Sequence, residues 1–143
     1  MRVLVDADAC PVVSIILQQC KMYRVPCILI CDTAHQFQAA CAETITVDKG
    51  MDSADFAIAN RIVAGDIVIT QDYGLASMCL ARGARVLHQD GWEYTENNMD
   101  ALLFLRDETR KYRMSGGKIK GPKKRTDSQN EAFSQILQTI LQG

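Results

Sequence analysis

The stretch VLVDADACP, residues 3–11, decides the fold. Its short run of apolar, β-branched residues predicts a buried strand, and Pro11 suits the first turn of a helix that follows. The same order of strand, turn and helix recurs along the chain. We expect further strands at residues 27–31, 44–47, 67–70 and 85–87, and helices at about 11–23, 32–42, 52–62 and 74–82. Because these strands are continuously apolar, they predict a mostly parallel sheet covered by helices on both faces, a three-layer α/β/α sandwich.

The last third of the chain predicts two further helices. Residues 88–96 are expected to be irregular and to lead into a helix over about 98–112. A flexible basic loop follows at about 113–126. A final helix over about 128–142 is indicated by Ser128 and Glu131, which have the spacing of a capping box. No internal repeat or second domain is evident, so residues 1–143 are interpreted as a single domain.

The composition of the 143 residues is typical of a soluble globular protein, with 48% hydrophobic and 23% charged residues. No apolar run reaches the roughly 18 residues of a membrane-spanning helix, and no signal-peptide pattern is evident, so we expect a cytoplasmic protein without a membrane partner. The six cysteines are then expected to be reduced. Cys10 precedes Pro11 at the start of a predicted helix, where a thiol can become reactive, and a packing role is the simpler interpretation. The apolar stripe of the final helix can pack on its own sheet or on a second protomer, which leaves a homo-oligomer open.

Acidic residues follow three of the predicted strands. Asp6 and Asp8 come directly after the first strand, Asp72 follows the fourth, and Asp52 and Asp55 lie in the first turn of the helix after the third. Since the carboxyl ends of parallel strands meet at one edge of a sheet, these side chains are expected to converge. Taken singly, Asp52, Asp55 and Asp72 also have structural interpretations, as a helix cap, a partner of the helix dipole and a turn residue.

Clustered carboxylates predict a divalent cation. They repel one another and raise one another's pKa unless a cation neutralises them, and their hard oxygen atoms suit Mg²⁺ or Mn²⁺. Such an ion can activate a water molecule and stabilise the charge that develops on a phosphoryl oxygen. The acidic edge therefore predicts hydrolysis of phosphodiester bonds.

Four segments, in this order, resemble the YaiI/YqxD family of small bacterial proteins: VDADACPV (5–12), MDSADFAIANR (51–61), GDIVITQDYGLA (65–76) and the GP pair before the final helix. The match covers nearly the whole chain. That family lies in the PIN-like superfamily, which is typified by Mg²⁺- or Mn²⁺-dependent ribonucleases. The resemblance therefore implies a PIN-like central sheet and a nuclease site, although the family itself has no established activity and fold alone does not fix function.

The resemblance also implies roles for particular residues. PIN nucleases carry an acid after the first strand and a T-x-D motif after the fourth, which here are Asp6 and the segment from Thr70 to Asp72. Asp52 or Asp55 would stand for the acid on a central helix, and Thr70 would orient a metal-bound carboxylate or water. Asp8 is an addition to that pattern. The implied catalytic set is Asp6, Asp8, Asp55, Thr70 and Asp72, and the implied metal ligands are Asp6, Asp8, Asp52, Asp55 and Asp72.

A change of charge along the chain indicates a polyanionic partner. Residues 1–110 carry 9 basic and 15 acidic groups, whereas residues 111–143 carry 7 and 2. An ordinary solvated loop is the simpler interpretation of the basic segment. Its density of charge beside an acidic site nevertheless favours a partner that is RNA, or single-stranded nucleic acid generally. The expected phosphate contacts are Lys118, Lys120, Lys123, Lys124 and Arg125.

Two other functions fit parts of the same pattern. The opening VLVDAD resembles that of haloacid dehalogenase-like phosphohydrolases, with Asp6 as nucleophile and Asp8 as acid or base. That class needs a Gly-Asp pair after a strand, whereas Gly65 and Asp66 precede one here, so this function ranks second. Alternatively, the same crevice and basic loop could bind nucleic acid as a non-catalytic PIN-like module.

Overall fold

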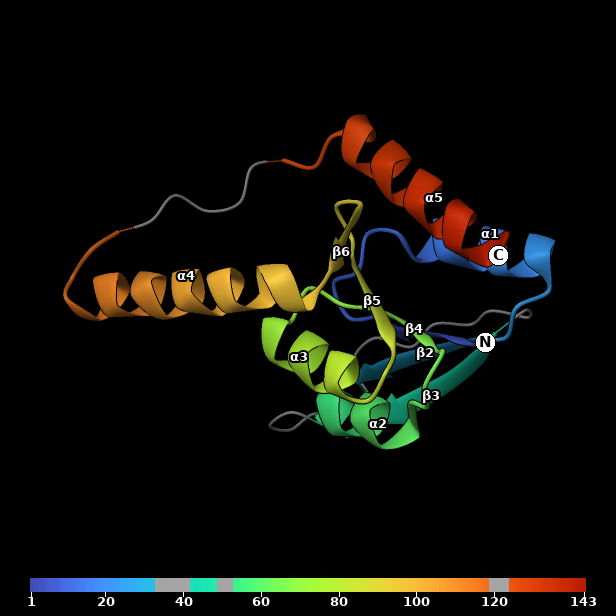
Figure 1. The fold of residues 1–143 in the computed structure, drawn as a ribbon, viewed down its shortest axis with the longest axis horizontal. Coiled ribbons are helices and arrows are strands. Elements are labelled where there is room, and N and C mark those ends of the chain that lie inside the picture. The colour runs from blue at the N-terminus through green and yellow to red at the C-terminus, as the bar shows by residue number, and fades with distance from the viewer. Residues whose placement is uncertain (33–41, 49–52, 119–123) are drawn as a thin grey trace.

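The computed structural model describes residues 1–32, 42–48, 53–118 and 124–143. Among the described elements, strands mostly alternate with helices, apart from the consecutive pairs β2–β3 and β5–β6, before two longer helices close the chain (Figure 1). The elements are β1 (Val3–Asp6), α1 (Val13–Tyr23), β2 (Cys27–Asp32), β3 (Glu43–Val47), α2 (Ser53–Arg61), β4 (Ile67–Ile69), α3 (Tyr73–Ala81), β5 (Arg85–His88), β6 (Trp92–Tyr94), α4 (Glu96–Met114) and α5 (Asp127–Leu141). The helix expected over residues 32–42 falls almost wholly outside the described residues.

The six strands form one sheet in the order β3-β2-β1-β4-β5-β6. All neighbouring pairs are parallel except β5 and β6, which are antiparallel. From β1 the chain moves outward through β2 to β3, and it then returns to place β4 on the other side of β1. The strand order thus reverses between β1 and β4, and in open α/β sheets the crevice beyond the carboxyl ends of two such strands is where ligands bind.

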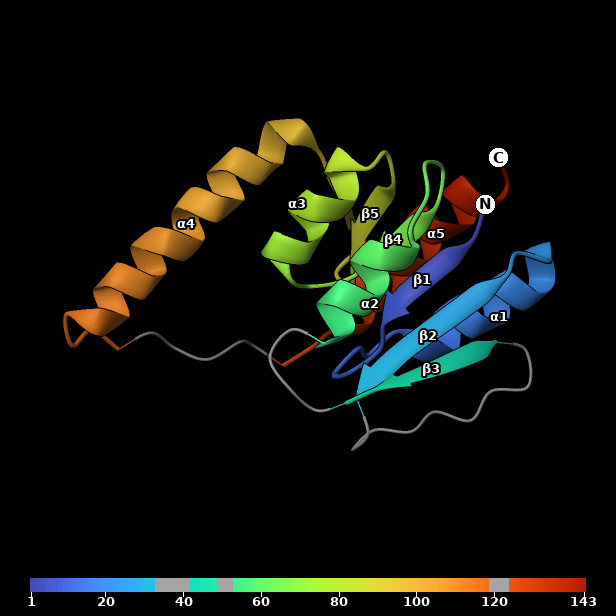
Figure 2. The same ribbon diagram turned by 90° about the horizontal axis from the view of Figure 1, so that it is seen from below.

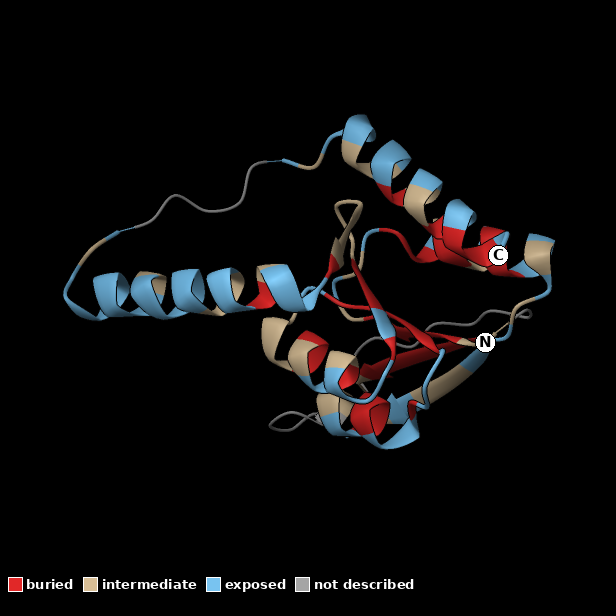
Figure 3. Cartoon of the chain, in the orientation of Figure 1, coloured by how far each residue is buried: buried red, intermediate tan, exposed pale blue. Residues whose placement is uncertain are grey.

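Two apolar layers cover the sheet, one on each face. Val3 and Val5 of β1 point into the layer formed with α1 and α5, whereas Leu4 points into the layer formed with α2 and α3. All three residues are fully buried. Figure 3 shows the same pattern, with β1, β2 and β4 mostly buried and α4 mostly exposed. The expected three-layer α/β sandwich with a mostly parallel sheet is therefore confirmed.

The stretch from residue 88 to 96 is not irregular, as the sequence predicted, but contains the edge strand β6. Gly91 turns the chain between β5 and β6 with a φ of +92°, a conformation that favours glycine. A Cβ atom at Gly91 would lie 2.6 Å from backbone atoms of Ala132 and Phe133 in α5. Glycine thus allows the turn both to form and to pack against the final helix. A strand of only three residues is too short to be predicted from alternation.

Both closing helices begin at threonine caps. Thr95 and Asn98 form a capping box at the start of α4, which begins two residues earlier than expected and continues to Met114. At α5 the capping box is formed by Thr126 and Gln129, not by the expected Ser128 and Glu131. A glutamine at the third helical position bonds back to the cap as a glutamate does, so both spacings fit the sequence signal.

Helix α4 leaves the body of the molecule and projects beyond it. Figure 2 shows its C-terminal half on the side toward which the strand arrows of β1 and β2 point. Of its 19 residues only Met99 is buried. Within the described residues, no helix is both long enough and apolar enough to cross a membrane.

Candidate active site

The candidate site lies where β1 and β4 end side by side. Val5 is paired with Ile69, so the next residues of the two strands leave the sheet at the same edge. Asp6 is the last residue of β1, Thr70 follows β4, and Asp72 caps the helix that comes next. The structure therefore brings together Asp6 and Asp72, which the sequence predicted to converge, and places Thr70 between them.

The hydroxyl of Thr70 joins the two acidic segments. It donates a hydrogen bond of 3.0 Å to Oδ2 of Asp6 and accepts one of 3.0 Å from the backbone N–H of Asp72. Thr70 is only 2% exposed, so its hydroxyl cannot exchange these partners for bulk water without opening the site. Its backbone carbonyl accepts a further hydrogen bond from the hydroxyl of buried Tyr94. Together these hydrogen bonds hold Thr70 in place, and its side chain connects the ends of β1 and β4.

Asp72 has the structural role that its position before a helix indicates. Its Oδ1 accepts hydrogen bonds from the backbone N–H groups of Gly74 and Leu75, at 2.9 and 3.2 Å. It is thus the N-cap of α3. Both cap bonds end on Oδ1 and neither involves Oδ2. A structural role and a ligand role are therefore compatible in one side chain.

Asp8 lies one step farther from the centre of this edge. Its Oδ2 accepts a hydrogen bond of 2.9 Å from the backbone N–H of Asp32, the last residue of β2. The loop then turns at Ala9, whose φ of +58° lies in the left-handed region that favours glycine. Asp8 therefore holds the end of β1 to the end of β2. The structure also adds Asp32 to the acids of this edge, which its place at the end of a predicted strand could have indicated.

The surroundings of Asp6 disfavour the negative charge of its carboxylate. Its pKa is raised to about 6, first by partial burial and then by the nearby negative charges of Asp72 and Asp8, against the lowering effect of the Thr70 hydrogen bond. At neutral pH the ionised form therefore exists at a cost. A divalent cation next to this carboxylate would offset the desolvation of its charge and the repulsion from Asp72 and Asp8.

A cavity of about 420 Å³ opens beside Asp72. Asp55, from the first turn of α2, lines it together with Asp72, so the structure brings the helix acid to the same place as the strand-end acid. The remaining lining residues are Phe56, Gly74, Leu75, Met78 and Arg106. Asp52, the other helix acid considered from the sequence, lies outside the described residues.

The described acids do not form a closed metal cage. Among residues 1–32, 42–48, 53–118 and 124–143, no three acidic, cysteine or histidine side chains are gathered tightly enough to hold an ion by themselves. Mg²⁺ differs from Ca²⁺ in this respect, because it keeps several waters and is commonly held by one or two carboxylates together with substrate phosphates. The oxygen donors of Asp6 and Asp72 fit that open kind of site.

The basic residues predicted from the sequence separate into different groups. Lys118 and Lys124 are exposed, whereas Lys120 and Lys123 lie outside the described residues. Arg125 is committed to the fold: its guanidinium donates to Oδ1 of Asp90 at 2.7 Å, to the carbonyl of Gln89 at 2.5 Å and to Oδ1 of Asn130 at 2.6 Å. The expected role of Arg125 as a phosphate contact therefore competes with its use in holding α5 to the turn between β5 and β6.

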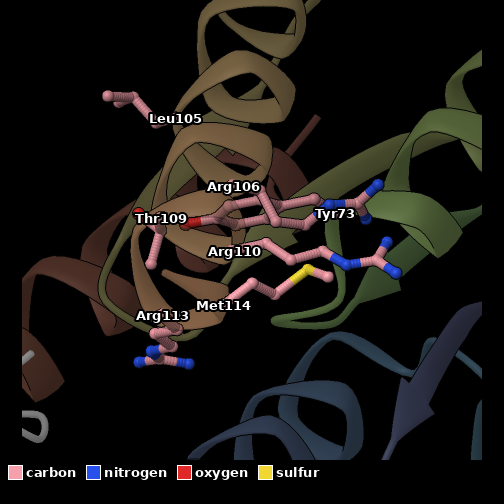
Figure 4. Close-up of a pocket in the computed structure, with 7 residues that line it drawn as sticks. All are labelled: Tyr73, Leu105, Arg106, Thr109, Arg110, Arg113 and Met114. Carbon is pink, nitrogen blue, oxygen red and sulfur yellow. The ribbon is translucent and has the colours of Figure 1, made fainter. Parts of the chain in front are cut away.

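Sequence reasoning missed the arginines of α4. Arg106, Arg110 and Arg113 line a second cavity of about 430 Å³, next to Tyr73 of α3 (Figure 4). The signal was present in the sequence, since positions three and four apart on a helix share a face. It was overlooked because the basic segment was defined by density of charge along the chain.

Two other sequence hypotheses can be placed. Asp66 lies at the start of β4, at the edge opposite the acidic site, where Arg2 pairs with it at 2.7 Å. This supports the exclusion of Asp66 from any phosphohydrolase motif at the acidic edge. Burial raises the pKa of the Cys10 thiol, which agrees with a packing role and not with an activated nucleophile.

The molecule is thus an α/β protein with an acidic site at the strand-order reversal of a mostly parallel sheet. Residues 4–143 match the family model described as "Uncharacterized BCR, YaiI/YqxD family". Relatives named "UPF0178 protein" occur in Exiguobacterium sibiricum, 47% identical with 99% of this chain and 96% of the relative covered, and in Ruminiclostridium cellulolyticum, 47% identical with 96% and 90% covered. A third, from Natranaerobius thermophilus, is 44% identical over 99% of this chain and 96% of its own. The chain belongs to the YaiI/YqxD family. No solved structure matches it.

Proposed function

We propose that this protein is a divalent-metal-dependent phosphodiester hydrolase, with single-stranded RNA as the leading substrate class. The observation that carries the proposal is the hydrogen-bonded link from Asp6 through Thr70 to Asp72 at the carboxyl ends of two neighbouring strands. Residues that touch one another from 64 positions apart, at the edge where α/β sheets bind ligands, favour a site over three separate structural roles.

The residues fit Mg²⁺ or Mn²⁺. The donors are carboxylate oxygens, the kind of ligand that both ions prefer. The pKa of Asp6 is raised mainly by its burial and further by the negative charges of Asp72 and Asp8, and cation binding would lower it. When bound, such an ion would acidify a water and balance charge on the phosphoryl oxygens. A PIN-like relationship and the ribonuclease chemistry that it implies belong to this proposal.

The side chains of the site divide the work between them. Asp6 and Asp72 provide the carboxylate oxygens that hold the cation. Thr70 orients Asp6 through its hydroxyl and fixes the backbone of Asp72, so the two carboxylates keep their relative position. Asp55, which shares a cavity with Asp72, accepts the proton of the attacking water or holds an additional ligand position. Asp8 braces the loop after β1 through its bond to the backbone of Asp32.

A cleavage assay tests the proposal. Metal-stripped protein would be incubated with labelled single-stranded RNA and DNA, with and without Mn²⁺ or Mg²⁺. Asp6→Asn and Asp72→Asn remove one charge each from the site, and Asp100→Asn, an exposed position on α4, is the matched control. We expect metal to restore cleavage in the parent and the control but in neither site variant. Metal-independent cleavage, or equal activity in Asp6→Asn, would overturn the proposal. Retained binding of nucleic acid without any cleavage would favour the non-catalytic module.

A further inference from the structure

Three arginines of α4 line the cavity of about 430 Å³ that lies between this helix and the start of α3. Figure 4 shows Arg106 and Arg110 extending side by side from α4, alongside Tyr73. The other lining residues are Leu105, Thr109, Arg113 and Met114. The cavity therefore presents several guanidinium groups and one aromatic ring to whatever enters it.

Near its start, α4 packs one face against the body of the protein. The arginines lie on the same face, closer to the end of the helix. Near its start, α4 contributes Met99, Leu102 and Leu103 to the apolar layer under α3. The same face then continues as Arg106, Arg110 and Arg113, at spacings of four and three residues. These three positions span about 10 Å of the helix axis, from a rise of about 1.5 Å per residue. An apolar stripe thus becomes a basic one where the helix leaves the core.

The three guanidinium groups are available for a ligand. All three arginines are exposed. In the part of the chain that the structure describes, their side chains make no hydrogen bond and no ion pair, unlike Lys111 on the same helix, which pairs with Glu108 at 3.5 Å. All three line one cavity; Figure 4 shows Arg106 and Arg110 extending together and Arg113 directed away from them. Arginine side chains that have no partner of their own are suited to phosphate groups, which they can bind through two parallel hydrogen bonds.

This basic cavity adjoins the acidic site. Arg106 lines both cavities, the second of which also contains Asp55 and Asp72. A Cβ atom built on Gly74 would lie 3.3 Å from Oδ1 of Asp72 and 3.7 Å from a guanidinium nitrogen of Arg106. Tyr73 directly follows Asp72 in the chain and is partly exposed, with its ring edge-to-face with Tyr94 at 5.9 Å. The aromatic ring and the first arginine are therefore immediate neighbours of a proposed metal ligand.

We propose that Arg106, Arg110 and Arg113, with Tyr73, form the binding track for a single-stranded polynucleotide, and that the strand leads from this track into the acidic site. The arginines bind successive backbone phosphates, and a base next to the scissile phosphate stacks on Tyr73. Such a combination of basic groove and aromatic platform binds single strands without reading their sequence. This inference rests on the proposed function for the direction of the strand, but the track itself can be tested without any cleavage.

Charge favours a polynucleotide over a second copy of this chain as the occupant. The formal net charge of the chain is −1, and its excess of acidic groups, 15 against 9 in residues 1–110, is spread over many elements and is not repeated at regular intervals. A phosphate backbone brings one negative charge per nucleotide at regular intervals. The cavity also shares Arg106 with the cavity lined by Asp55 and Asp72, and these carboxylates would bind phosphates only through a cation.

The test compares neighbouring residues of one helix. Arg110→Ala and Lys111→Ala remove the same charge from adjacent positions, but only Arg110 lines the cavity. Binding of a labelled single-stranded RNA and of its DNA counterpart would be measured in a metal chelator by fluorescence anisotropy across a salt titration. We expect Arg110→Ala and Arg113→Ala each to reduce the slope of log K against log salt by about 0.7, and Lys111→Ala to leave it unchanged. Tyr73→Leu is expected to weaken binding by roughly tenfold with little change of slope.

The outcomes separate this inference from the proposed function. If the parent cleaves RNA with Mn²⁺ but Arg110→Ala binds and cleaves as the parent does, the track is wrong and the nuclease stands. If the parent binds through the arginines but never cleaves, the track stands and the nuclease is wrong. Size-exclusion chromatography provides the remaining control. A change of oligomeric state in Arg110→Ala, with unchanged nucleic-acid binding, would assign this face to contact between copies and overturn the track.

Discussion

The hydroxyl of Thr70 donates a hydrogen bond to Oδ2 of Asp6 across the ends of two neighbouring strands. The hydroxyl oxygen of Thr70 also accepts a hydrogen bond from the backbone N–H of Asp72, so one buried side chain contacts both the carboxylate of Asp6 and the backbone of Asp72. A site whose acids are arranged through a shared, buried hydroxyl is already organised before any cation arrives. This arrangement is a form of preorganisation, in which the protein has met the cost of ordering its ligands on folding.

Thr70→Val tests the connection, because valine keeps the branched shape and removes the hydroxyl. The backbone N–H of Asp72 then loses its partner, which we expect to cost about 1–3 kcal/mol of unfolding free energy. The pKa of Asp6 should also rise further, since the lost bond favoured the ionised form. Urea unfolding and metal-dependent cleavage measure the two effects. Thr70→Ser retains a hydroxyl and should recover much of both, and equal behaviour of the two variants would contradict this role.

Asp6 predicts a particular pH dependence of the metal-free protein. Its pKa is about 6 in the folded state and 3.8 when unperturbed, so folding favours the protonated form. The stability contributed by this group is full below about pH 4 and is lost as the pH rises through about 6, a difference of about 3 kcal/mol at most. The unfolding free energy of the parent should therefore fall over this window in a chelator, relative to that of Asp6→Asn. Added Mn²⁺ should reverse the loss at neutral pH. If the unfolding free energies of the two proteins changed in parallel with pH, ionisation of Asp6 would carry no cost in stability, which would contradict this prediction.

Asp72 should separate into a capping role and a charge role. Asn and Ser are good N-cap residues, so Asp72→Asn and Asp72→Ser should unfold within about 0.5 kcal/mol of the parent, whereas Asp72→Ala should cost about 1 kcal/mol. All three variants lack the carboxylate, and all three should lose metal-dependent cleavage. Thermal unfolding and the cleavage assay measure the two roles on the same samples. Activity that followed stability across the series would mean that Asp72 acts only as a cap.

Arg125 is expected to matter for folding more than for binding. Its side chain is 20% exposed and makes three hydrogen bonds, one of them to the carboxylate of Asp90. We expect Arg125→Gln to lower the unfolding free energy by about 2 kcal/mol, while Lys124→Gln at the exposed neighbouring position stays within about 0.5 kcal/mol of the parent. Denaturant unfolding provides the comparison. If Arg125→Gln were as stable as the parent but bound RNA more weakly, the result would contradict this prediction and support the role of Arg125 as a phosphate contact.

The sheet and the acidic edge were predictable from the sequence because strong local signals carry them. Buried strands such as Ile67–Ile69 are continuously apolar, and the parallel arrangement follows from their alternation with helices. Once the strands are parallel, a residue at the carboxyl end of each must lie at one edge, which places Asp6 and Asp72 together. The specific bond through Thr70 depends on strand order and register, and the sequence does not contain these in readable form.

The features that could not be predicted from the sequence also depend on contacts between different parts of the fold. Strand β6 is three residues long and is defined by its pairing with β5, a contact that no local pattern records. Arg125 is held in the fold by a hydrogen bond to Asp90, 35 positions away. The density of basic residues along the chain could therefore not distinguish Arg125 from an exposed lysine. The row of arginines on α4 was predictable from helical spacing, but the position of Arg106 beside Asp55 and Asp72 was not, because it depends on the angle at which α4 leaves the sheet.

A calorimetric titration of Mn²⁺ into metal-stripped protein at neutral pH tests the central claim most directly, because it needs neither substrate nor turnover. Parent, Asp6→Asn, Asp72→Asn and the control Asp100→Asn would be titrated under the same conditions. We expect saturable binding in the parent and in Asp100→Asn, and its loss in both site variants. Binding that is absent from the parent, or that survives unchanged in Asp6→Asn, would contradict the assignment of a divalent cation to the carboxyl ends of β1 and β4.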